Sequence, residues 1–184
     1  MKTVTERPMS LEEFDALPET VLPRQLVEGQ LIMALAPDRF HQSLVGILHG
    51  ELYAWVRMHP GQGELYIAPF DVQLPGLNVY QPDVMFFRHD HLDRLTDQRA
   101  LGAPDLAVEV LSPSTAHYDL NEKRLHYGKS GVGELWIVNP KRKHVQVYLL
   151  GQEVDRPVRF LKAGLVLTTD LLPGFELPLD RLFR

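Results

Sequence analysis

The stretch Leu106-Ala107-Val108-Glu109-Val110-Leu111 decides the fold. Its apolar residues occupy both alternating sets of positions, as in a strand that is covered on both faces. Such a strand belongs in the middle of a sheet that has other layers packed against it. Glu109 is costly there, because an ionised carboxylate cannot be buried cheaply without a cation, a metal ion or hydrogen-bond donors. Two interpretations stay open: a buried ion pair or a carboxyl of raised pKa, and a metal-binding or catalytic residue.

Turn signals and periodicity predict the elements around this strand. A capping box at Ser10 to Glu13 opens a short helix, and a hairpin turns at Glu28-Gly29. A long amphipathic helix runs from Asp38 to about Met58, with Leu44, Leu48, Leu52 and Trp55 on its apolar stripe. The remaining expected elements are strands at residues 24–28, 30–35, 64–74, 80–87, 105–111, 134–138, 144–150 and 158–161, and a helix near residues 117–129. This order predicts a mixed α/β (α+β) fold, a central mixed sheet flanked by helices.

The chain has 184 residues, of which 45% are hydrophobic and 23% are charged. We expect one domain over residues 1–184, with a flexible lead at residues 1–8. No apolar run reaches the roughly 20 residues of a membrane-spanning helix, and the N-terminus lacks the apolar core of a secretory signal. The expected location is therefore the cytoplasm, without a membrane partner.

The chain has no cysteine and a formal charge of −5. Disulfides and cysteine-type zinc sites are thereby excluded, so a bound metal would be held by carboxylates, carbonyls or histidines. Oxygen ligands favour hard cations such as Mg²⁺ or Mn²⁺. The acidic balance argues against a protein that coats nucleic acid nonspecifically, but a nuclease with local basic groups remains compatible with it.

Asp83 lies at the start of the expected strand at residues 80–87, directly after Gln81-Pro82. Pro82 removes a backbone donor, which suits the first residues of a strand or a bulge. Alone, Asp83 would be interpreted as a residue that stabilises a turn. Paired with Glu109, it becomes a candidate metal ligand.

Lys123 is the third candidate. Ala116, Leu120, Lys123 and Tyr127 fall on one face of the expected helix, so a lysine interrupts an apolar stripe. One interpretation is a surface lysine whose ammonium reaches solvent. The other is a lysine whose ammonium reaches the carboxylates. Two carboxylates with one ammonium suit phosphodiester hydrolysis, in which a metal activates water and the lysine stabilises developing charge.

At these residues the sequence resembles the Uma-two family of restriction-endonuclease-like proteins in the PD-(D/E)XK nuclease superfamily. The most specific segment is EVLSPST at residues 109–115, with its downstream Lys123. The other matching segments are residues 9–14, 26–31, 41–42, 81–83, 102–106, 108–111, 118–119, 122–124 and 134–138.

The resemblance implies a restriction-endonuclease-like fold with a metal site at the strand ends. It implies that Asp83, Glu109 and Val110 hold Mg²⁺ or Mn²⁺, and that Lys123 takes the lysine role. The superfamily lysine usually lies two residues after the acidic residue, where this chain has Leu111. Glu28 and His41 are implied as accessory catalytic residues; from the residues alone, Glu28 is a solvated turn residue and His41 a packed or capping histidine.

The expected function is a metal-dependent DNA endonuclease, and a homodimer is expected because two active sites often share the cutting of a duplex. Two other functions stay open. One is a nucleic-acid-binding module without catalytic activity, and the other is a structural or interaction protein in which Glu109 and Lys123 form only an ion pair.

Four further features are interpreted as structural. Residues 89–91, His-Asp-His, are expected in a solvated loop, and Ser112 and Ser114 at a helix entry. Asp71 is expected to solvate the open face of its strand. Lys141-Arg142-Lys143-His144 is expected to form a polar hairpin turn, with contact to a phosphate backbone as the alternative.

Overall fold

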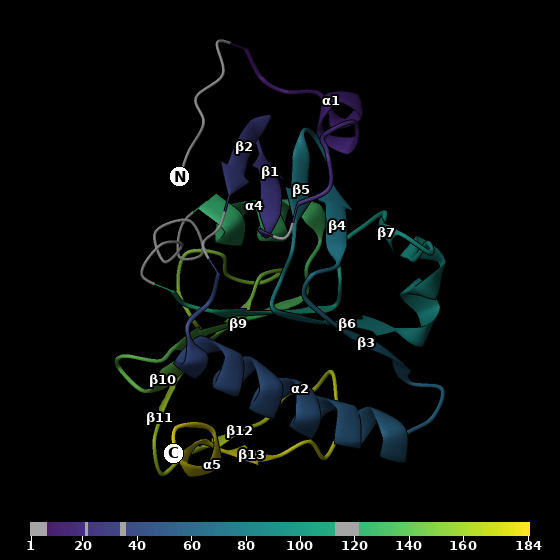
Figure 1. The fold of residues 1–184 in the computed structure, drawn as a ribbon. Helices are drawn as coiled ribbons and strands as arrows, with labels where there is room; N and C mark the ends of the chain where they lie inside the picture. The colour runs from purple at the N-terminus through teal and green to yellow at the C-terminus, as the bar shows by residue number, and fades with distance from the viewer. Residues whose placement is uncertain (1–6, 21, 34–35, 113–121) are drawn as a thin grey trace.

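A six-stranded mixed sheet forms the centre of the fold (Figure 1), in a computed structural model that describes residues 7–20, 22–33, 36–112 and 122–184. Strand β8 (Leu106–Val110) lies inside this sheet, as the sequence predicts; it is antiparallel to β6 and parallel to β9. The full order is β11 (Arg159–Lys162), β10 (His144–Leu149), β9 (Glu134–Asn139), β8, β6 (Val84–Arg88) and β3 (Gly63–Ile67). The predicted antiparallel pair at residues 134–138 and 144–150 is confirmed as β9 and β10.

A second sheet packs over one face of the central sheet (Figure 1). Its five strands, in order, are β2 (Gln30–Met33), β1 (Arg24–Val27), β5 (Asn78–Tyr80), β4 (Asp71–Leu74) and β7 (Arg99–Ala100). The hairpin of β1 and β2 turns at Glu28 and Gly29, as predicted, with φ of 49° and 76°. Two successive positive φ angles are typical of a two-residue turn that follows the twist of the strands. The end of the predicted strand at residues 34–35 lies outside the described residues.

The prediction of continuous strands at residues 64–74 and 80–87 is wrong. The first divides into β3 of the central sheet and β4 of the second sheet. The other divides into β5 of the second sheet and β6 of the central sheet, so the chain crosses back. Each division falls at a proline, Pro69 or Pro82, which has no N–H to donate to a neighbouring strand. The backbone N–H of Ala68 donates to the carbonyl of Asp83 at 3.1 Å, so the two crossings lie side by side. Asp83 therefore stands at the junction between the sheets.

The predicted N-terminal and long helices are confirmed. Helix α1 (Leu11–Asp15) begins with the complete capping box of Ser10 and Glu13. Helix α2 (Arg39–Met58) begins at Asp38, whose side chain accepts a hydrogen bond from the backbone N–H of His41 at 2.9 Å. The stripe of Leu44, Leu48, Leu52 and Trp55 is buried.

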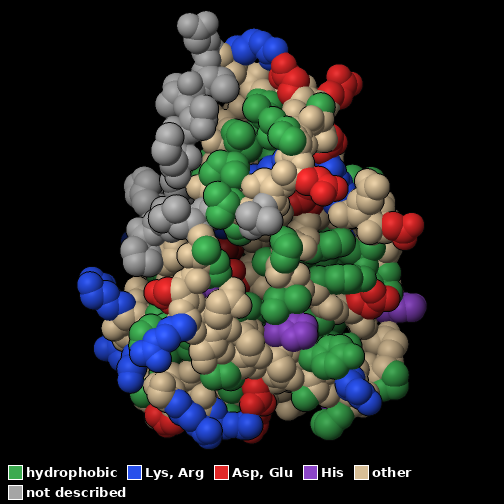
Figure 2. All heavy atoms as spheres, viewed as in Figure 1, with side chains coloured by type: hydrophobic (Ala, Val, Ile, Leu, Met, Phe, Trp, Pro, Cys, Tyr) green, Lys and Arg blue, Asp and Glu red, His purple; other side chains and the backbone are tan. Residues whose placement is uncertain are grey.

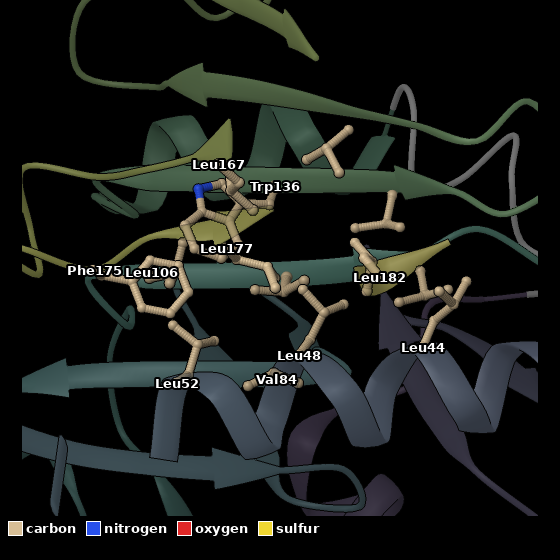
Figure 3. Packing of buried hydrophobic residues seen from close by; sticks show 14 of the residues in the cluster. Leu44, Leu48, Leu52, Val84, Leu106, Trp136, Leu167, Phe175, Leu177 and Leu182 are labelled. Carbon is tan, nitrogen blue, oxygen red and sulfur yellow. The ribbon is translucent and has the colours of Figure 1, made fainter. Parts of the chain in front are cut away.

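The central sheet separates two apolar cores. One face packs against α2 and the C-terminal segment, which contains β12 (Val166–Leu167), β13 (Leu177–Pro178) and α5 (Leu179–Leu182). Figure 3 shows Leu48 and Leu52 of α2 packed toward Val84, Leu106 and Trp136 of the sheet, with Leu167 and Leu177 from the C-terminal segment. The other face packs against the second sheet and α4 (Arg124–Ser130). Figure 1 shows the same layers, with α2 on one side of the central sheet and the second sheet on the other.

Several expectations fall partly outside the described residues. The predicted helix at residues 117–129 is described only from Glu122, and its continuation α4 ends at Ser130, before Gly131 with a φ of 90°. Ala116, Leu120 and Ser114 lie outside the described residues, as do residues 1–6 of the expected flexible lead. The predicted strand at residues 158–161 begins one residue later, as β11. Among the described residues, no helix is long and apolar enough to cross a membrane.

Candidate active site

A pocket of about 730 Å³ lies where the second sheet meets the ends of β8 and α2. Asp83, Glu109, Val110, Lys123 and His41 all line it. These residues come from the junction before β6, from β8, from the residue directly before α4 and from the first turn of α2. Figure 2 shows acidic side chains recessed between the two halves of the molecule in this view. The structure thus brings five of the six predicted site residues to one pocket.

Asp83 is tied to the end of β8 by a backbone hydrogen bond. Its Oδ2 accepts from the N–H of Val110 at 2.7 Å and lies 3.3 Å from Nε2 of His41. Its side chain is 17% exposed. Because Val110 directly follows Glu109, this bond holds the two carboxylates beside each other although 27 residues separate Asp83 from Val110.

Glu109 is buried and accepts hydrogen bonds at both carboxylate oxygens. The Tyr127 hydroxyl donates to Oε1 at 2.6 Å, and the Lys123 ammonium donates to Oε2 at 3.0 Å. Lys123 is only 5% exposed, so the interpretation of a lysine that reaches solvent is wrong. The helical pattern puts Tyr127 on the same face as Lys123 but does not predict its bond to Glu109; the i, i+4 spacing from Lys123 is the available signal.

His41 carries a raised pKa. Burial by itself lowers the pKa of this imidazole, but the hydrogen bond and charge of Asp83, together with the charges of Asp38 and Glu109, outweigh that effect. A larger fraction of His41 is therefore protonated near neutral pH than for an ordinary histidine. Its Nδ1 is buried and makes no hydrogen bond within the described part of the chain.

Glu28 does not line the pocket. Its side chain is 75% exposed, and its Oε1 lies 3.1 Å from Nε2 of His126. His126 in turn shares a hydrogen bond with the Tyr80 hydroxyl, and the Tyr80 ring lies edge-on against Tyr127 at 5.4 Å between centroids. The hairpin directs Glu28 toward α4, so the structure does not bring it together with Asp83 and Glu109.

Two polar residues of the pocket were not recognised as site residues in the sequence. Gln81 Nε2 donates to Asp71 Oδ1 at 2.8 Å, so Asp71 faces the pocket and does not only solvate its strand. Gln81 Oε1 is buried and has no hydrogen-bond partner among the described residues. A buried acceptor without a donor is costly, which makes this oxygen a place where a ligand could donate. The position of Gln81 before Pro82-Asp83 was the only available signal.

The carboxylates fit a divalent metal of the Mg²⁺ type. No group of three or more His, Asp or Glu side chains lies close enough to hold a metal within the residues that the structure describes. Mg²⁺ does not require one, because it keeps several waters and binds through one or two carboxylates together with substrate oxygens. Oδ1 of Asp83 makes no hydrogen bond in the described ranges, and Glu109 brings a second carboxylate to the same pocket. The donor set is therefore suitable.

The other motifs have structural contacts. Residues 89–91 open a short 3₁₀ helix, η1 (His89–Arg94), and do not form a loop. His91 Nδ1 lies 2.9 Å from Oδ1 of Asp105, whose Oδ2 accepts from the Arg88 backbone. Ser112 lines the pocket next to Val110.

Comparison with known proteins identifies one family whose model matches this chain and a solved structure with a similar fold. The model of the Uma2 (Uma-two) family, described as "Putative restriction endonuclease", matches residues 11–180. The fold is similar to that in a crystal structure of a "putative nuclease belonging to DUF820" from Anabaena variabilis ATCC 29413. That similarity has a TM-score of 0.78 at 23% sequence identity, and it covers 96% of this chain and 98% of the other. No curated protein matches the chain.

Proposed function

Because this chain belongs to the Uma2 family, we propose that it is a Mg²⁺- or Mn²⁺-dependent endonuclease that hydrolyses phosphodiester bonds in DNA. The observation that carries the proposal is the hydrogen bond from the Val110 N–H to Asp83, which holds Asp83 next to Glu109. Two carboxylates in one pocket, with an ammonium at one of them, can bind a metal and stabilise negative charge on a phosphate.

Each residue has a role in this proposal. Asp83 and Glu109 would hold the metal through their carboxylates. Val110 would contribute its backbone carbonyl oxygen as a ligand, because its side chain has no ligand atom. A bound metal of this type lowers the pKa of a coordinated water and neutralises charge on the phosphate. The Lys123 ammonium contacts Glu109 at 3.0 Å and adds positive charge to the pocket. His41 donates toward Asp83 and restricts its orientation.

Carboxylate variants test the proposal against a matched buried carboxylate. Purified protein is incubated with supercoiled and linear DNA in Mg²⁺, in Mn²⁺ or in EDTA. Asp83→Asn and Glu109→Gln should each lower metal-dependent cleavage by about 100-fold or more, because they remove a preorganised charged group. Glu134→Gln is the control, since Glu134 is equally buried but lies outside the pocket. Intact DNA after incubation with metal-replete wild-type protein would contradict the proposal.

One observation favours a second candidate, in which the site is only a buried ion pair. Both oxygens of Glu109 already accept hydrogen bonds, from Lys123 and Tyr127. Calorimetric titration with Mn²⁺ separates the two candidates. Binding by the wild type and its loss in Asp83→Asn support the metal site, whereas wild-type protein that does not bind Mn²⁺ leaves the ion pair as the explanation.

A further inference from the structure

The turn between β9 and β10 carries three consecutive cationic side chains, Lys141, Arg142 and Lys143. All three residues are exposed, and none forms an ion pair with a described residue. Lys162 of β11 is also exposed and pairs in register with His144, directly after the turn. In a chain of net charge −5, this local excess of positive charge is unusual. We name these four residues, Lys141, Arg142, Lys143 and Lys162, the basic turn.

Strand pairing places the basic turn at the pocket end of the central sheet. β8 and β9 are parallel, and Val110 pairs with Val138. The turn begins at Pro140, two residues farther along β9. With about 4.8 Å between strands and about 3.3 Å per residue, the turn begins roughly 8 to 10 Å from Val110. The sheet therefore presents the basic turn and the two carboxylates at the same end.

The space-filling view agrees with this placement. Figure 2 shows Lys and Arg side chains gathered at the lower left of the molecule, where Figure 1 places β10 and β11. The recessed acidic side chains lie higher in the same view. A polymer with regularly spaced negative charges could contact the positive surface and the pocket at once.

We propose that the basic turn binds backbone phosphates of the nucleic acid strand that enters the pocket. The inference rests on the proposed nuclease function and identifies the surface that selects a polymer over a single phosphodiester. Because each phosphate of one strand takes up about 3.4 Å of the duplex axis, a separation of about 10 Å along that axis corresponds to about three nucleotides from the bond in the pocket. These side chains contact phosphates and not bases, so they add affinity without sequence preference.

The turn can lose its charges without losing its conformation. Lys143 has a φ of 48°, which asparagine adopts more easily than lysine. Asn139 Oδ1 accepts from the backbone N–H of Arg142 at 2.9 Å, a bond that a side-chain change at Arg142 leaves intact. The turn variant is therefore Lys141→Gln, Arg142→Gln and Lys143→Asn together.

A control variant removes the same charge from the other end of the sheet. Arg57, Lys129 and Arg156 are exposed and form no ion pair with a described residue. They lie at the end of α2, at the end of α4 and in the connection that leaves β10. Changing all three to Gln lowers the formal charge by the same amount as the turn variant. Thermal unfolding of both variants checks that the fold is retained.

The first measurement is binding of a fluorescein-labelled DNA duplex of 20 base pairs in EDTA, over a series of salt concentrations. We expect the turn variant to bind at least about tenfold more weakly at 50 mM salt. The slope of log affinity against log salt should fall in magnitude by about 2 to 3, since each phosphate contact contributes about 0.9. The control variant should change affinity by less than about threefold. Equal effects in the two variants, or no effect in either, would overturn the inference.

The second measurement separates this inference from the proposed function. Bis(4-nitrophenyl) phosphate has one phosphodiester and no neighbouring phosphates, so its metal-dependent hydrolysis should be the same in the wild type and the turn variant. Only DNA cleavage should fall. A parallel loss on both substrates would contradict a role in backbone binding. If the wild type cleaves neither substrate, the proposed function fails, and the binding measurement still decides whether the basic turn binds DNA.

Discussion

Glu109 and Glu134 are two buried glutamates on neighbouring parallel strands, and only one of them lies in the pocket. Their exposed fractions are 3% and 2%, and each accepts side-chain hydrogen bonds at both carboxylate oxygens. By burial and hydrogen bonding alone, they would be equally good candidates for a functional residue.

The partners of the two glutamates differ in charge. Glu109 accepts from the Lys123 ammonium, whereas Glu134 accepts from the Trp136 indole and the Thr169 hydroxyl, both at 2.6 Å. Among the described residues, the cation that pairs with Glu134 is Arg159, at 3.9 Å. Burial raises the pKa of Glu134, and the bonds from Thr169 and Trp136 offset that rise only in part. A buried carboxylate thus indicates a site only together with a pocket, a second carboxylate and a charged partner.

The largest expected effect is the loss of stability when the cation beside each glutamate is removed, and we expect it to differ between Lys123 and Arg159. Lys123→Met should lower the free energy of unfolding by about 3–5 kcal/mol, because it leaves Glu109 charged and buried. Arg159→Met should cost less, about 1–2 kcal/mol, because its contact with Glu134 is long and its side chain is 35% exposed, so the loss comes mainly from its hydrogen bonds to Thr168. Urea unfolding at neutral pH measures both. The double variant Lys123→Met with Glu109→Gln should recover much of the stability without recovering DNA cleavage; equal losses in the two single variants would break the comparison.

A second expected effect concerns the hydroxyl groups. Tyr127→Phe removes a hydrogen bond to a charged carboxylate and should cost about 1.5–3 kcal/mol of unfolding free energy. It should also lower DNA cleavage, because Glu109 loses a donor that fixes the position of its Oε1. Thr169→Val removes the corresponding bond to Glu134 and should reduce stability while cleavage stays at the wild-type rate. A loss of cleavage in Thr169→Val would show that the two glutamates are coupled.

The smallest expected effect is a pH dependence at Glu134. Its pKa in the folded protein is raised above the ordinary value, so the folded state favours the neutral form. The stability from this group is fully present below the unfolded pKa and is lost as the pH rises through the folded pKa. Glutamine cannot ionise, so Glu134→Gln should become more stable relative to the wild type as the pH rises from about 4 to 7. Urea unfolding across this range measures the difference; a constant difference would mean that burial does not shift this carboxyl.

The sequence by itself determined the elements that depend on local patterns. The apolar run around Glu109 predicts the central strand, the capping box predicts α1, and the stripe from Leu44 to Trp55 predicts the buried face of α2. These signals arise within a few residues, where turn chemistry, capping and periodicity act. Helical phase also indicated Lys123, which the structure places at Glu109.

The tertiary structure alone decided which residues meet. The sheet that β4 and β5 join depends on pairing with β1, from the N-terminal hairpin, which no local pattern specifies. Thr169 reaches Glu134 from 35 residues away, and the hairpin directs Glu28 to His126 and away from the pocket. The bond from Val110 to Asp83 forms only because the chain crosses between two sheets beside β8. The burial of a carboxylate can be inferred from its neighbours in the sequence. The groups that compensate for this burial come from distant segments, and only the packing of the chain decides which segments these are.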